Sequence, residues 1–288
     1  MEEESLAQIH QRPSLSEPLL IVCMEGWIDA GFGAMTAVNT MLAGMTTELV
    51  ATFDGDRLLD QRARRPTVKI VDGLITELNW PQIQLRHGRH EDRDLLLLTG
   101  PEPDVRWRGF VAEVVELARD FEVSLSVGLG AFPAPVPHTR PVRLVSSATS
   151  RDLANAVGWI GGGIEVPAGI QAALEAAFGQ AGIPAVGIWA RVPHYVTAMP
   201  YPAASAALLE GLVRVGGPEF PVRDLEMAAE VTRTRIDELI ANSEEHLAMV
   251  SQLEAQHDAE VSQPADLSNL PSGDEIAAEL ERFLRGEG

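Results

Sequence analysis

Cysteine and lysine are almost absent from this sequence. Cys23 is the single cysteine of the 288 residues, and Lys69 is the single lysine. A lone cysteine excludes an intrachain disulfide and a thiolate-based metal cluster, and it suits a reducing cytoplasm. A lone lysine leaves one candidate for chemistry that needs an amine, such as a Schiff base or a phosphate-binding loop.

Long apolar runs and excess positive charge are also missing. The longest clean apolar run, Leu95–Leu98, is far shorter than the about 18 residues that a membrane span needs. The chain starts Met1-Glu2-Glu3-Glu4, whereas an export signal starts with basic residues. The net charge of -20 at pH 7 repels polyanions. We therefore expect a cytoplasmic protein that binds neither membrane nor nucleic acid.

Apolar residues nevertheless make up 45% of the chain, which is enough for a sizeable core. Between residues 18 and 215, short apolar runs alternate with helical patterns. This alternation predicts an α/β core domain, a three-layer sandwich with a mixed central sheet. The expected strands are 18–24, 48–53, 67–71, 74–78, 82–86, 94–99, 123–129, 142–146 and 184–190, and the main expected helices are 34–42, 106–121, 167–178 and 203–215.

Both ends of the chain differ from this central part. Residues 1–17 lack periodicity and predict a mobile arm. After Gly216-Gly217-Pro218, residues 219–288 hold 17 acidic and 5 basic residues. This shift predicts that residues 216–288 form an acidic helical appendage. Its first part, 222–260, is expected as one long amphipathic helix or a bent pair, and a capping box at Ser272–Glu275 predicts a last helix with Ile276, Leu280 and Leu284 on one side.

Asp29 lies in a glycine-rich turn, residues 26–33, between the first strand and the first helix. Ligands of open parallel sheets bind beyond the carboxyl ends of strands, and helix N-terminal amides hold anions. The glycine spacing fits neither a dinucleotide fingerprint nor a phosphate loop. The other interpretation, which we favour, is that Asp29 caps the helix.

A second candidate segment follows the strand 94–99. It carries Glu102, Asp104, Arg106, Trp107 and Arg108 on a proline-stiffened loop. Two carboxylates, two arginine forks and an indole suit a polar ligand or a protein partner. A purely local role, with Asp104 capping the next helix and the arginines paired to the acids, explains the same residues equally well.

The third candidate is the loop that contains His138 and Arg140. A histidine titrates near neutral pH and suits a general base or a ligand contact, although surface histidines are commoner. His87 and His90 have no third committed ligand nearby, so we predict no metal and no cofactor. Ser146, Ser147 and Ser150 lie in a plausible turn between a strand and a helix, but no partner for them is evident, and no complete set of catalytic residues is found.

Several motifs, taken in order, resemble one known family. Residues 25–31 read Glu-Gly-Trp-Ile-Asp-Ala-Gly, residues 100–103 read Gly-Pro-Glu-Pro, and residues 127–131 read Val-Gly-Leu-Gly-Ala. Together with residues 187–193, they look like the bacterial branch of the proteasome assembly chaperone 2 family over about residues 18–215. The long acidic C-terminal helix and the preference for arginine are similar to those of actinobacterial members.

The resemblance implies a nucleoside-phosphorylase-like α/β fold, self-association to a homo-oligomer and, by analogy with archaeal and eukaryotic members, binding to proteasome subunits. It implies no catalytic residues. One feature departs from the family: its chaperones often end in a hydrophobic residue, a tyrosine and one more residue, whereas this sequence ends Arg285-Gly286-Glu287-Gly288. Docking through an aromatic C-terminus is therefore not expected here.

Two main hypotheses about function remain, beside a third in which the C-terminal helix acts only as a coiled-coil assembly device. The first is a non-catalytic interaction protein that oligomerises and binds a protein partner. The second is an enzyme, a hydrolase or phosphorylase, that acts on a nucleoside-like or polar metabolite at the loops that follow the strands. The second requires those loops to converge on a concave site.

Overall fold

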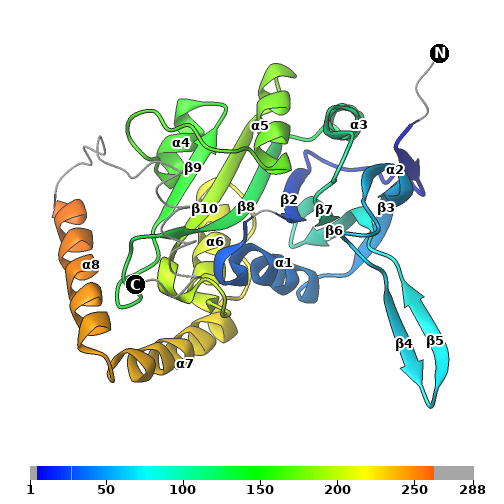
Figure 1. The fold of residues 1–288 in the computed structure, drawn as a ribbon. Helices are drawn as coiled ribbons and strands as arrows, with labels where there is room; N and C mark the ends of the chain where they lie inside the picture. The colour runs from blue at the N-terminus through cyan, green and yellow to red at the C-terminus, as the bar shows by residue number, and fades with distance from the viewer. Residues whose placement is uncertain (1–4, 27, 263–288) are drawn as a thin grey trace.

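The computed structural model describes residues 5–26 and 28–262 of the chain. Its centre is an eight-stranded sheet in the order β1-β3-β6-β7-β2-β8-β10-β9 (Figure 1). The four strands β7, β2, β8 and β10 run parallel, and the remaining pairings of this sheet are antiparallel. The bounds are β1 (Ala7–Ile9), β2 (Leu19–Glu25), β3 (Thr47–Phe53), β6 (Ile83–His90), β7 (Arg93–Pro101), β8 (Leu125–Ala134), β9 (Leu144–Ala148) and β10 (Ala185–Pro193).

Helices cover both faces of this sheet. One core cluster joins the sheet to α1 (Gly33–Ala43), α6 (Pro202–Arg214) and α7 (Arg223–Ile240). The other joins the opposite face to α3 (Trp107–Asp120) and α5 (Ile170–Gln180). The short helices α2 (Gly55–Leu58) and α4 (Arg151–Val157) complete the core. The predicted three-layer α/β architecture with a mixed sheet and C-terminal helices is confirmed.

The run Leu95–Leu98 shows why the sheet is central. Leu95 and Leu97 belong to one core cluster, while Leu96 and Leu98 belong to the other. A strand that is buried on both faces needs apolar residues at every position, because successive side chains point to opposite sides. The unbroken apolar run therefore marks β7 as an inner strand of a covered sheet.

The N-terminal segment differs from the mobile arm that we expected. Residues 7–9 form β1, which pairs antiparallel with β3 at the edge of the sheet. Leu6 is buried in the core, and Arg12 forms an ion pair with Asp120 at 3.0 Å. A strand of three residues is too short to show an alternating pattern, so no sequence pattern indicates this pairing.

Strands β4 (Thr67–Val71) and β5 (Leu74–Asn79) form a separate two-stranded sheet. Figure 1 shows this hairpin projecting away from the body of the molecule. The Asp72-Gly73 turn has φ values of 51° and 82°, as a two-residue hairpin turn requires. The hairpin was predicted correctly, but its separation from the main sheet was not.

Of the two arrangements expected for residues 222–260, one long helix or a bent pair, the structure has the pair. The first is α7 and the second is α8 (Glu244–Ser262). Ile236, Ile240 and Val250 are buried and join the core, so α7 and α8 pack on the α/β domain. Residue 216 as a domain boundary stays a prediction. The predicted helix with its capping box at Ser272 lies outside the described residues. Among the described helices, none has the length and apolarity that crossing a membrane requires.

Candidate functional site

The predicted loops lie at one edge of the sheet, which we call the carboxyl edge. It is the edge where the parallel strands β2, β7, β8 and β10 end. Asp29 follows β2, Glu102 follows β7, His138 follows β8 and Tyr195 follows β10. A backbone bridge between Asp29 and Ala131 ties the loop after β2 to strand β8. These side chains therefore lie at one edge of the sheet, and their contacts decide what they do there.

Asp29 caps helix α1. Its Oδ1 accepts a hydrogen bond from the backbone N–H of Ala34 at 2.8 Å, and its Oδ2 accepts one from Met35 at 3.0 Å. Burial raises the pKa of the Asp29 carboxyl, and these backbone hydrogen bonds partly oppose that rise. The carboxylate occupies the amides that would hold an anion, so the capping interpretation describes its contacts.

Glu102 is buried at the same edge and contacts the start of helix α5. Its Oε1 accepts a hydrogen bond from the Ile170 N–H at 2.7 Å. The backbone N–H of Glu102 donates to the Glu25 carbonyl, which joins the ends of β7 and β2. A Cβ at Gly26 would overlap the Glu102 side chain, so Gly26 makes room for this carboxylate. A negative charge at a helix N-terminus is favourable.

The residues after Glu102 point in different directions. Asp104 accepts hydrogen bonds from the Asp60 N–H and from Arg64, instead of capping the next helix. Arg106 precedes α3 and is exposed. Trp107 is half-buried and donates its indole N–H to the Pro103 carbonyl. Arg108 lies on α3, beside α5. These residues therefore do not converge with Asp29 and His138 on one concave site.

His138 is buried and both ring nitrogens have partners. Nδ1 lies 2.7 Å from the Tyr195 hydroxyl, and Nε2 lies 2.9 Å from Oδ1 of Asp237 on α7. Because a carboxylate only accepts, Nε2 donates to Asp237, and in the neutral ring Nδ1 accepts from the Tyr195 hydroxyl. The Tyr195 oxygen in turn accepts the His138 backbone N–H at 2.9 Å. Burial raises the pKa of Tyr195 to about 12. His138 is thus fully engaged within the chain.

Arg140 holds helix α8. Its guanidinium forms a two-pronged contact with Asp258, through Nε to Oδ1 at 2.9 Å and Nη2 to Oδ2 at 2.8 Å. Nη1 donates to Glu254 Oε1 at 3.1 Å, and Thr139 donates to the same oxygen. This paired geometry is the strong form of an arginine–carboxylate contact. The loop 138–140 therefore fastens the C-terminal helices to the carboxyl edge.

The two histidines near the end of β6 contact different parts of the chain. His87 Nε2 lies 3.0 Å from Oδ1 of the buried Asp94, while His90 Nε2 lies 2.9 Å from the Glu219 carbonyl and its ring stacks on Phe220. Within residues 5–26 and 28–262, no group of three or more histidine, cysteine or acidic side chains is arranged to hold a metal ion.

Sequence reasoning missed Glu175 and the partner of Ser147. Glu175 lies on α5, is buried, and its Oε2 accepts the Ser147 hydroxyl proton at 2.6 Å. Gln171 donates to its Oε1 at 3.2 Å. Burial raises the pKa of Glu175 to about 7, and these two hydrogen bonds oppose the rise. A Cβ at Gly187 would overlap the carboxylate, so this glycine in β10 is the one sequence signal that accompanies Glu175.

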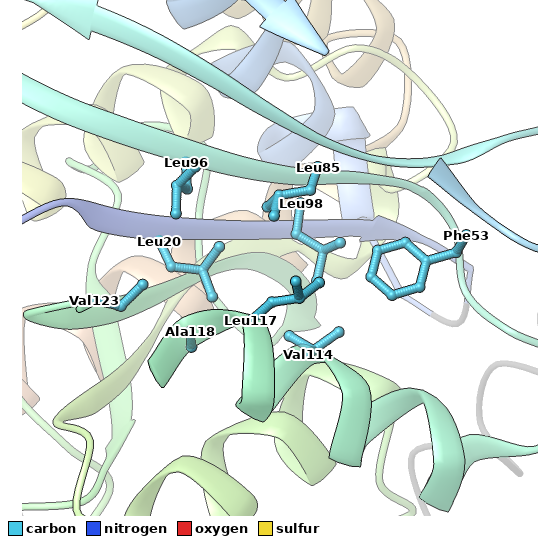
Figure 2. Close-up of a pocket in the computed structure, with 9 residues that line it drawn as sticks. All are labelled: Leu20, Phe53, Leu85, Leu96, Leu98, Val114, Leu117, Ala118 and Val123. Atoms are coloured by element: carbon cyan, nitrogen blue, oxygen red, sulfur yellow. The ribbon is translucent and has the colours of Figure 1, made fainter. Parts of the chain in front are cut away.

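A small hollow lies between the sheet and α3, away from all of these residues. Figure 2 shows its lining, which comes from β2, β3, β6, β7 and α3 and from the segment before β8. Every lining side chain is apolar and buried: Leu20, Phe53, Leu85, Leu96, Leu98, Val114, Leu117, Ala118 and Val123. It offers no polar group that would orient a metabolite. We interpret it as a packing hollow of the core.

Comparisons with known proteins agree with this architecture. The model of the PAC2 family matches residues 23–240. A Corynebacterium glutamicum protein of unknown function is 31% identical, with a TM-score of 0.84, over 90% of this chain and 99% of that one. A Mycobacterium tuberculosis proteasome-assembly chaperone homologue is 38% identical, with a TM-score of 0.75, over 81% of this chain and 99% of that one.

A PAC2 family protein from Streptomyces avermitilis is similar to the same extent, with 36% identity and a TM-score of 0.73 over 81% of this chain and 99% of that one. No curated protein matches the chain in sequence. The matched family residues 23–240 contain the carboxyl edge, α1, α6 and all of α7. By its sequence over most of its length and by its fold, this chain belongs to the PAC2 family.

Proposed function

We propose that this chain is a non-catalytic, self-associating protein that binds a protein partner, and that proteasome subunits are the first partner to test. The observation that carries the proposal is the internal use of the carboxyl edge. Asp29, Glu102 and His138 each bond to a helix of the same chain. A catalytic carboxylate or imidazole must instead reach the reacting atoms.

The family supports the choice of partner. The Mycobacterium tuberculosis relative described above is named a proteasome-assembly chaperone homologue. Arg106 and Arg108 are exposed, and arginine is enriched at protein–protein contacts. We also propose a cytoplasmic location, because a single buried cysteine, Cys23, suits a reducing compartment.

The hairpin formed by β4 and β5 supports self-association. An isolated two-stranded hairpin has little stability of its own in water. Six of its apolar side chains are between 45% and 72% exposed: Val68, Ile70, Val71, Leu74, Ile75 and Leu78. Neither of its edges pairs with a strand from the described residues, so the backbone groups there lack strand partners in that part of the chain. We infer that a second copy of the chain covers the hairpin.

We expect Ile75→Lys to reduce the oligomer to a monomer, because it places a charge in the buried interface. Light scattering of the purified chain at about 10–100 μM, where interfaces of moderate affinity are filled, measures the mass. Thr67→Lys is the matched control, since Thr67 is exposed on the same hairpin, and it should keep the oligomer. A wild-type monomer, or an unchanged mass for Ile75→Lys, contradicts this prediction.

We expect the purified chain to form a complex with proteasome α-subunits of the same organism on size-exclusion chromatography. Replacing Arg106 with glutamate should weaken it, while Arg235→Glu, on the exposed side of α7, should not. Turnover of nucleosides, with phosphate or by hydrolysis, is measured in the same samples. Absence of any complex at about 50 μM, where even weak interfaces bind, counts against the proposal, and turnover would favour the enzyme hypothesis.

A further inference from the structure

Arginine is concentrated in two short segments beside the start of α3. Residues 60–65 and 104–108 together hold five of the 22 basic residues of the chain and only two of its 42 acidic residues. Because acidic residues predominate elsewhere, these segments form a local excess of positive charge. Four of their arginines are exposed, and we call them the arginine surface: Arg62, Arg65, Arg106 and Arg108.

Hydrogen bonds hold the two segments together. The backbone N–H groups of Asp104 and Val105 both donate to the Leu58 carbonyl, at 2.9 and 3.3 Å. The Asp60 N–H donates to Oδ2 of Asp104 at 2.8 Å, and Nε of Arg64 donates to Oδ1 at 3.2 Å. The Asp60 carbonyl also accepts the Arg64 N–H at 2.8 Å, which closes a turn within the first segment. The arginines are therefore carried on a fixed backbone, which a partner does not have to order.

The acidic residues of the two segments are occupied, whereas three of the exposed arginines are not. Both carboxylate oxygens of Asp104 accept the hydrogen bonds described above, and Oδ1 of Asp60 accepts the backbone N–H of Arg62 at 2.8 Å. The side chains of Arg62, Arg65 and Arg108 form no ion pair with any of residues 5–26 and 28–262. Within this part of the chain, nothing neutralises their charges.

Two neighbouring features also suit a partner that carries carboxylates. Helix α3 begins at Trp107, and its N-cap residue, Arg106, supplies no side-chain acceptor. The positive end of the helix dipole therefore adds to the charge of the arginines. Val105, in the same segment, is 51% exposed and offers an apolar contact beside these charges.

We propose that the arginine surface binds an acidic segment of a protein partner. Carboxylates of that segment pair with the guanidinium groups, and an apolar side chain next to them contacts Val105. Arginine presents paired N–H donors that match the two oxygens of a carboxylate. The proposal rests on the proposed function only in requiring that the chain has a protein partner.

An acidic protein segment fits this surface better than a nucleic acid does. The net charge of -20 repels a long polyanion along most of its length. A short acidic segment meets only the local field, because exposed charges more than about 10 Å away are largely screened at about 0.1 M salt. Figure 1 shows α2 and α3 on the side of the molecule away from α8, so that helix does not neutralise the arginines.

An NMR titration of the labelled full-length chain with a synthetic peptide tests the proposal. The probe is the acetylated amide of Glu-Glu-Leu-Glu-Glu, at about 50 mM salt, where ion pairs are weakly screened. We expect the amide signals of residues 60–65 and 104–108 to shift, with half-saturation at about 0.1–1 mM peptide. R62E/R65E should weaken binding at least about tenfold, because two attractive charges become repulsive.

The matched control is R214E/R235E, which changes the net charge by the same amount at exposed arginines of α6 and α7. It should bind the peptide within about twofold of wild type, because its charges lie outside the arginine surface. Equal weakening in the two double variants would overturn the proposal, since net charge alone would then explain it. The amide spectrum shows whether each variant is folded. If R62E/R65E is not, Arg108→Glu replaces it, with an expected weakening of at least about threefold.

Three further results would overturn the proposal. The first is the absence of a saturable shift at about 5 mM peptide. The second is equal binding of the peptide Gln-Gln-Leu-Gln-Gln, because carboxylates would then contribute nothing. The third is equal or tighter binding of a single-stranded oligothymidylate, because the surface would then recognise a phosphate polymer instead of a protein segment.

The result is distinguishable from the test with proteasome subunits. If the chain binds α-subunits but not the peptide, the arginine surface is wrong and the proposed function stands. If the chain binds the peptide but no α-subunit, the arginine surface is supported and its partner is a different protein.

Discussion

Gly100→Ala is expected to lower the free energy of unfolding by about 3–5 kcal/mol, because two penalties add. Gly100 has φ of +116°, a conformation that side chains disfavour. A Cβ at this position would also overlap the carbonyl oxygen of Gln82 and approach Cα of Ile83. Both obstacles are backbone atoms, one just before β6 and one at its first residue, so they cannot rotate away as a side chain would.

Gly158→Ala is the matched control for the backbone conformation alone. Gly158 has φ of +106°, but the nearest atom to its missing Cβ is the Leu144 carbonyl oxygen at 3.7 Å, an ordinary contact. Urea denaturation should place Gly100→Ala below Gly158→Ala by about 2 kcal/mol, the cost of the overlap. Equal losses in the two variants would contradict the argument.

Gly100→Ala is also expected to disturb the carboxyl edge. Two residues after Gly100, Glu102 reaches the backbone N–H of Ile170 and the carbonyl of Glu25. The position of this carboxylate therefore depends on a backbone conformation near the end of β7 that only glycine fits well. If Gly100→Ala folds at all, we expect the protection of the first turn of α5 against hydrogen exchange to fall with it.

Local patterns predicted most of the architecture. The unbroken apolar run of β7, the order of strand, glycine-rich turn and helix at Asp29, and the Asp72-Gly73 turn are all features of a few neighbouring residues. Their structural consequences are set by local sterics and by the need to bury both faces of an inner strand. The three-layer fold follows because these elements alternate along the chain.

Contacts between distant residues could not be predicted in this way. His138 meets Asp237 across 99 residues, and Arg140 meets Asp258 across 118 residues. Nothing near His138 in the sequence indicates that an acidic helix will satisfy it. The same holds for the hairpin. The sequence pattern of β4 and β5 predicts two paired strands, but it does not indicate whether they join the main sheet. Only the whole fold decides which loops at the carboxyl edge stay open to a partner.

Glu175→Gln is expected to change how stability depends on pH. The folded-state pKa of Glu175 is raised to about 7 from 4.5. Below about pH 4.5 the carboxyl is protonated in both the folded and the unfolded chain, so its ionisation does not lower the free energy of unfolding. Between about pH 4.5 and 7 the unfolded chain releases the proton while the folded chain keeps it, and stability falls as the pH rises.

Above pH 7 the raised pKa of Glu175 lowers the free energy of unfolding by about 3 kcal/mol, because each pKa unit corresponds to about 1.4 kcal/mol. Glutamine cannot ionise, but its amide still accepts the Ser147 hydroxyl proton. The stability of Glu175→Gln relative to wild type should therefore rise by about 3 kcal/mol between pH 4.5 and 8. Urea denaturation at several pH values measures this difference, and Glu238→Gln on the exposed side of α7 is the control.

A direct titration separates this explanation from a general effect of charge. Removing one negative charge from a chain of net charge -20 reduces repulsion, and Glu238→Gln does so equally. Only the buried carboxyl is expected to titrate near pH 7 in the folded protein, which the carboxyl carbon signals of labelled glutamates report in NMR spectra. A Glu175 signal that titrates near pH 4.5, or an equal pH response in both variants, would show that burial between α5 and β10 does not hold the proton on this side chain.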